Sequence, residues 1–209
     1  MSNLNIAGYC IRPFVVTVPE EFHRTLFIQK HFKEMGIEAE EFAGISANES
    51  GVVTNHTYDV DHPGSGYKIG AKPTACWLSF YMLWSALNAM PDYHFLTLEW
   101  DAQFLPNWRE RTEQALRDVP PDFDILFLGS CCTAGRPTTK IKGEVFEVKY
   151  PLCGHATIIA KKALPTILKT QRKVYAPIDI SLAFHTLPHL KVYTVLPRVC
   201  DQFGTEIPT

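Results

Sequence analysis

One segment of this chain, residues 74–90, is apolar on almost every side and is therefore expected to lie inside the fold. Its large apolar side chains are Trp77, Leu78, Phe80, Met82, Leu83, Trp84 and Leu87. A helix with apolar residues all round is buried by the elements that surround it. Strand-like and helix-like segments alternate on both sides of this helix. This order predicts an α/β fold with a mostly parallel central sheet flanked by helices.

The other expected elements follow from short apolar runs and from apolar residues spaced three or four apart. Strands are predicted over residues 14–18, 37–42, 95–98, 124–129, 156–159 and 191–196. Helices are predicted over residues 20–35, 74–90, 107–119, 161–169 and 177–187, with a hairpin over residues 142–149. The sequence has no internal repeat, and 209 residues suffice for one core, so we expect a single domain over residues 1–209.

Two carboxylates follow the apolar strand at residues 95–98. Glu99 and Asp101 stand where this strand meets solvent, and ligands of open α/β sheets bind at the carboxyl ends of strands. Carboxylate oxygens suit Mg²⁺ or Mn²⁺, which in turn neutralise the diphosphate of a leaving group. The alternative is a strand end that carries two solvated acids without a ligand.

Several further segments occur in a fixed order around these acids. They are residues 15–18 followed by Arg24, then 75–84, 96–102, 124–129, 154–163, 177–179 and 197–202. In this order they resemble glycosyltransferase family 25, whose members include lipooligosaccharide galactosyltransferases and collagen galactosyltransferases. That family is similar in fold to the GT-A nucleotide-sugar enzymes. The resemblance covers most of the chain.

The resemblance implies an enzyme that transfers a sugar from a nucleotide sugar, here a UDP-sugar, to a hydroxyl acceptor. Mn²⁺ or Mg²⁺ would be held by Glu99 and Asp101, and Asp179 would act as the general base. The nucleotide would be contacted by Arg24, Ser79, Glu99 and Gln202. For Asp179 the alternative is an acid that only stabilises the start of its helix. Arg24 and Ser79 have the equivalent alternatives of a surface arginine and a serine satisfied within its helix.

Two residues depart from the family pattern. Trp100 replaces the middle acid of the metal motif, and Phe80 replaces the histidine that follows Ser79. Trp100 would either stack against the sheet or a helix, or form an apolar wall beside the donor. These departures leave open a catalytically impaired protein that binds sugar, nucleotide or a partner. A transferase acting on modified DNA is a further alternative, although the net charge of −2 weighs against nucleic acid.

The remaining features concern location and acceptor. The first residues lack the charged and apolar regions of a secretory signal, and long apolar spans are absent, so we expect a cytoplasmic protein with no transmembrane segment. The six cysteines form no C-x-x-C pair and are expected to be reduced thiols. The acceptor would be a glycan, a lipid-linked sugar or another hydroxyl compound. Residues 46–73 and 131–151 are polar connections, of which at least one is expected to close over the donor as a lid.

Overall fold

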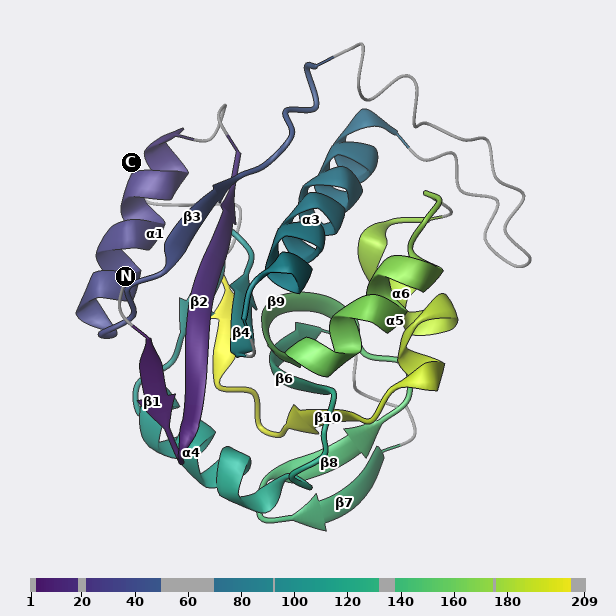
Figure 1. The fold of residues 1–209 in the computed structure, drawn as a ribbon. Coiled ribbons are helices and arrows are strands. Elements are labelled where there is room, and N and C mark those ends of the chain that lie inside the picture. Colours follow the sequence, from purple (N-terminus) through teal and green to yellow (C-terminus); the bar gives the residue numbers. More distant parts are fainter. Residues whose placement is uncertain are drawn as a thin grey trace.

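The computed structural model describes residues 3–18, 22–49, 70–91, 93–131, 138–174 and 176–203, which form a sheet covered by helices (Figure 1). The strands are β1 (Leu4–Ile6), β2 (Tyr9–Thr17), β3 (Glu40–Ala43), β4 (His94–Leu98), β5 (Ala102–Phe104), β6 (Ile125–Cys131), β7 (Thr138–Lys142), β8 (Val145–Val148), β9 (Leu152–Ala160), β10 (Val192–Val195) and β11 (Cys200–Gln202). The helices are α1 (Phe22–Glu34), α3 (Ala71–Ala89), α4 (Trp108–Asp118), α5 (Leu164–Thr170) and α6 (Ile178–His185), with short 3₁₀ turns η2 (Lys161–Ala163) and η3 (Leu187–His189). Most of the lid segment expected over residues 46–73 lies outside the described residues, as do residues 132–137 of the second.

The expected α/β architecture with flanking helices is confirmed, but the described sheet is mixed instead of mostly parallel. The main sheet has the strand order β1-β2-β4-β9-β6-β10-β8-β7, with β3 paired to β2. Strand β2 runs parallel to β3 and β4, and β10 runs parallel to β6. Strand β9 is antiparallel to both of its neighbours, β4 and β6. Strand β9 follows the predicted hairpin, which the structure forms from β7 and β8, and no crossover helix stands among the described residues between β6 and β9. Because only parallel neighbours require such a crossover, β9 can run antiparallel.

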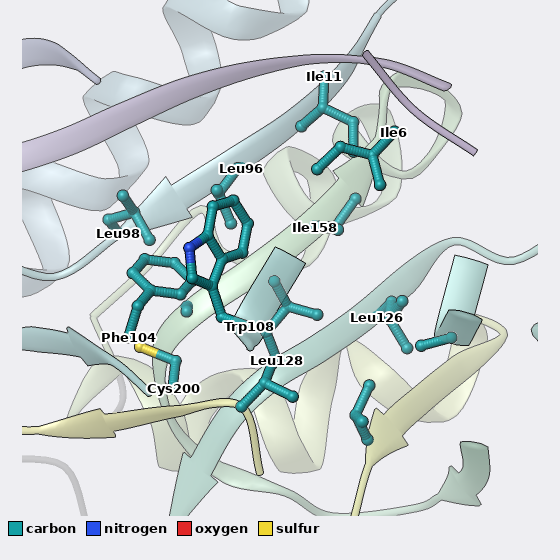
Figure 2. Packing of buried hydrophobic residues seen from close by; sticks show 14 of the residues in the cluster. Ile6, Ile11, Leu96, Leu98, Phe104, Trp108, Leu126, Leu128, Ile158 and Cys200 are labelled. Carbon is teal, nitrogen blue, oxygen red and sulfur yellow. The ribbon is translucent and has the colours of Figure 1, made fainter. Parts of the chain in front are cut away.

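Apolar side chains alternate along the central strands and fill both faces of the sheet. On one face, Leu96, Leu126 and Ile158 pack with Trp108 of α4 (Figure 2). On the other face, side chains of α3, α5 and α6 pack on a second cluster of buried apolar residues, which includes Phe95. Successive residues such as Phe95 and Leu96 point to opposite faces because the side-chain period of a strand is two. Burying an aliphatic or aromatic side chain of this size contributes roughly 1.5–3 kcal/mol.

Helix α3 begins three residues before its predicted start and is buried along most of its length. Trp77, Leu83 and Leu87 are buried, whereas Met82 is 47% exposed. The expectation of burial on every side is therefore wrong for this position. The elements packed around α3 leave one strip of it uncovered, because α5 and α6 lie beside the helix and do not enclose it (Figure 1).

A buried polar network joins α3 to the segment that carries α5 and α6. The side-chain oxygen of Gln171 accepts hydrogen bonds from the Trp77 indole at 3.2 Å and from the Ser181 hydroxyl at 2.8 Å. Its amide nitrogen donates to the Thr186 hydroxyl at 2.8 Å. Since Ser181 lies in the middle of α6 and Thr186 directly follows its last residue, this network fixes the helix whose first turn carries Asp179.

Candidate functional site

Glu99, Asp101 and Gln202 meet beyond the carboxyl end of β4. The backbone N–H of Glu99 donates to the His155 carbonyl at 3.1 Å, which extends the β4–β9 pairing as far as the first acid. The side-chain amide of Gln202 donates to a carboxylate oxygen of Glu99 at 3.4 Å and to one of Asp101 at 3.3 Å. Strand β11 delivers Gln202 by pairing with β5, which follows Asp101 directly. Residues a hundred positions apart therefore share one site.

Asp179 approaches the same site from the first turn of α6. One of its carboxylate oxygens accepts the backbone N–H of Cys153 at 3.2 Å, and the other accepts the N–H of Ile180 at 2.8 Å. Its charge raises the pKa of Glu99, so the two carboxylates are close enough to interact. The predicted base and the predicted metal ligands thus lie at one edge of the sheet.

Glu99 and Asp101 have raised pKa values. Burial, with the charges of Asp101 and Asp179, raises the pKa of Glu99 to about 8, although the backbone N–H of Gly154 opposes the shift. Burial also raises the pKa of Asp101, against the hydrogen bond from Gln202 and the charge of Arg24. A carboxylate taken from water beside another carboxylate is costly to ionise, so a cation placed between them would be strongly favoured.

Glu99 and Asp101 offer carboxylate oxygens to a divalent cation, but few further protein ligands surround them. In the part of the chain that the structure describes, no group of three or more His, Cys, Asp or Glu side chains is arranged to hold a metal ion. Glu99 and Asp101 nevertheless face one shared donor, and the second carboxylate oxygen of Asp101 is buried without a partner among the described residues. Mg²⁺ is commonly held by one or two carboxylates, with water and substrate phosphates completing its shell. The pair fits a cation shared with a substrate and not one enclosed by protein alone.

Arg24 and Trp100 pack together beside Asp101. The guanidinium carbon of Arg24 lies 4.6 Å from the centre of the Trp100 ring, a cation–π arrangement. The charge of the arginine opposes the rise in the pKa of Asp101, so the guanidinium lies close enough to interact with that carboxylate. Trp100 therefore stacks against a residue of helix α1, one of the two placements expected for it.

The hydroxyl of Ser79 is engaged in two hydrogen bonds within the protein. Its hydroxyl donates to the Ala75 carbonyl at 2.7 Å and accepts the N–H of Ile45 at 2.7 Å, and the residue is 2% exposed. The structure thus gives Ser79 the helix-internal role that was the alternative to nucleotide contact, and we do not carry it into the proposed site.

The sequence did not point to the backbone amides of Cys153 and Gly154, which contact Asp179 and Glu99. The signal available in the sequence was Gly154, which stands just before the strand predicted over residues 156–159. Cys153 has a left-handed conformation, with φ of 58°, and it is disulfide-bonded. The expectation of a reduced thiol is therefore wrong for Cys153. Cys10, Cys76 and Cys200 are free.

The likeness of this chain to known proteins lies in its structure and not in its sequence. No protein-family model matches the chain, and no curated protein matches it. The structure is similar to the crystal structure of a glycosyltransferase involved in the glycosylation of the major capsid of PBCV-1, with 11% sequence identity and a TM-score of 0.49. The match covers 88% of this chain and 81% of the other. A likeness of this size bears on neither activity nor substrate.

Among the helices in the described part of the chain, none is both long enough and apolar enough to cross a membrane.

Proposed function

We propose that this protein is a metal-dependent glycosyltransferase that moves a sugar from a UDP-sugar to a hydroxyl acceptor. The observation that carries the proposal is that Glu99, Asp101 and Asp179 lie together at the carboxyl end of β4. Gln202 bridges the first two through its side-chain amide. The residues that meet there are those that the resemblance to glycosyltransferase family 25 assigns to metal binding and catalysis.

Glu99 and Asp101 are proposed to hold Mn²⁺ or Mg²⁺ together with the donor diphosphate. When bound, the cation supplies Lewis-acid stabilisation of the departing nucleoside diphosphate. Gln202 keeps the two carboxylates turned toward each other through its amide hydrogens. Arg24 adds a positive charge on the same side, held in place by its contact with Trp100. Together these groups favour a ligand with several negative charges.

Asp179 is proposed as the general base that takes the proton of the acceptor hydroxyl. Two backbone N–H groups donate to its carboxylate, an arrangement that orients the group toward the site. The buried network around Gln171 fixes the helix beneath it. A base held in this way needs little reorganisation when the acceptor arrives.

The metal step is tested by measuring UDP affinity calorimetrically with Mn²⁺ and with EDTA. We expect EDTA to weaken binding at least tenfold and Asp101→Asn to reproduce that loss in the presence of Mn²⁺. Asp122→Asn is the matched control, because Asp122 is a surface acid paired with Lys191. Equal UDP affinity in wild type with Mn²⁺, wild type with EDTA and Asp101→Asn would refute the proposal of a metal bridge.

The base is tested with Asp179→Asn, which keeps the size of the side chain. We expect UDP–Mn²⁺ affinity to stay within about twofold of wild type while turnover falls by about 10²-fold or more. Normal turnover combined with a lower unfolding temperature would show instead that Asp179 only stabilises the start of α6.

A second candidate is a binding protein that has lost catalysis. The substitution of the central acid by Trp100, and its stacking with Arg24, favour this candidate. It predicts that UDP binds tightly while no sugar is transferred or hydrolysed from any donor tested with Mn²⁺ present. Measurable hydrolysis of a UDP-sugar that is lost in Asp179→Asn would exclude it.

A further inference from the structure

A narrow cavity of about 40 Å³ lies between the sheet and the helix layer formed by α3, α5 and α6. Glu99, Gly154 and Asp179 line one end of it, and Trp84, Ile167 and Leu187 line the other. Gly154 and Ile159 of β9 both contribute to the wall. Five residues of a strand span roughly 16 Å, so the cavity is long for its volume.

The cavity opens at the acidic end and is closed at the other. Glu99, Gly154 and Asp179 are partly exposed, as are the lining residues Cys153, Ile178 and Leu182, whereas Trp84 and Leu187 are each 3% exposed. A ligand group can therefore enter beside the proposed metal ligand and the proposed base. The space continues the proposed active site and is not a separate surface pocket.

The cavity wall has few polar groups that are free to hydrogen-bond to water. The two threonines on it use their hydroxyls internally, since Thr97 donates to the Thr157 carbonyl and Thr157 donates to the Gly154 carbonyl, each at 3.3 Å. A buried water needs two to four polar partners. Beyond the acids, the remaining polar group is the indole N–H of Trp84, which has no hydrogen-bond partner among the described residues. An apolar group therefore suits this space better than water does.

We propose that the cavity holds the unbranched apolar chain of an acceptor whose hydroxyl group lies beside Asp179. This inference rests on the proposed function and narrows its acceptor to an amphipathic alcohol or lipid. The slim shape excludes branched and polycyclic groups, and the closed end limits the length of the chain. The apolar wall supplies affinity, while the acids at the mouth remain free for the hydroxyl.

The test uses straight-chain alcohols, from butanol to decanol, with the full-length protein in the absence of nucleotide and metal. The readout is the nuclear magnetic resonance signal of the Trp84 indole N–H, assigned by its loss in Trp84→Phe. We expect a saturable shift, with affinity rising about fourfold for each methylene buried. The gain should stop between butanol and hexanol, because a cavity of about 40 Å³ has room for only about three water molecules or a chain of equal volume.

Two variants probe the two ends. A Cβ at Gly154 would lie 3.5 Å from Thr157 Oγ1 and 3.7 Å from Phe127 Cε1, ordinary contact distances, so Gly154→Ala narrows the mouth without a clash. We expect it to weaken hexanol binding at least fivefold. Gly70→Ala is its control, because a Cβ there meets nothing within 4 Å.

Leu187→Ala enlarges the closed end and should move the length limit toward longer alcohols. Leu116→Ala, on the opposite face of the sheet, should leave the limit unchanged although it also loses a buried leucine. An unmoved Trp84 signal with every alcohol, or identical binding in wild type and Gly154→Ala, would overturn the proposal. Because no UDP or Mn²⁺ is present, alcohol binding can succeed even if the metal bridge fails, and the reverse also holds.

Discussion

Replacing Gln171 by methionine tests how strongly the buried network fixes the helix that carries Asp179. Gln171 is fully buried and makes three side-chain hydrogen bonds, with Trp77, Ser181 and Thr186. Methionine has a similar length and fits an apolar space, but its sulfur is a weak acceptor and it donates nothing. The substitution therefore removes the polar partner without leaving a large cavity.

The expected loss of stability follows from the groups left unpaired. The Ser181 hydroxyl can turn to the carbonyl four residues earlier in its helix, and the Thr186 hydroxyl keeps its contact with Thr170 at 2.7 Å. The Trp77 indole N–H has no such substitute. An unsatisfied buried donor costs about 1–3 kcal/mol, and weaker replacement bonds at the other two groups add to this. We expect a total of about 3 kcal/mol, equivalent to about 6–12 °C in Tm for a chain of this length.

The assay is urea denaturation of wild type, Gln171→Met and Thr170→Val. The last variant removes one partly buried hydroxyl and should cost less than about 1 kcal/mol. A Gln171→Met protein within 1 kcal/mol of wild type, or equal to Thr170→Val, would refute the role of the network. Turnover of Gln171→Met should also fall while UDP–Mn²⁺ affinity is kept, since α6 carries the proposed base and not the proposed metal ligands.

Two further predictions concern the strands that hold the site. A Cβ at Gly129 would lie 2.4 Å from both the His155 ring and the Cys200 carbonyl, so Gly129→Ala should cost about 1–3 kcal/mol in urea denaturation and weaken UDP–Mn²⁺ binding by displacing β11. His31 accepts the backbone N–H of Phe104 at 2.9 Å, and burial lowers its pKa. The contribution of neutral His31 to the free energy of unfolding is complete above pH about 6.5. It is lost as the pH falls through the lowered pKa of His31 in the folded protein. His31→Gln should therefore flatten the decline in stability below that pH, and an unchanged slope would contradict this.

The sequence determined the local elements and the identity of the acids. The apolar run over residues 95–98 predicts a strand that stops just before Glu99, and β4 ends at Leu98 in the structure. The predicted helices over residues 74–90 and 107–119 appear as α3 and α4 within a few residues. These predictions depend on contacts between neighbours in the chain, and periodicity within a segment reports such contacts directly. The placement of Glu99 at a strand end follows from the same local pattern.

The tertiary structure alone decided how the site is assembled. Strand β9 begins at Leu152, earlier than predicted, and runs antiparallel between β4 and β6. Its insertion brings the amides of Cys153 and Gly154 to the acids, and the short β5–β11 pairing brings Gln202. Pairing partners and strand direction depend on loop closure and on burial across the whole sheet, which no single segment encodes. The raised pKa of Glu99 has the same origin, because it arises from burial and from charges supplied by distant parts of the chain.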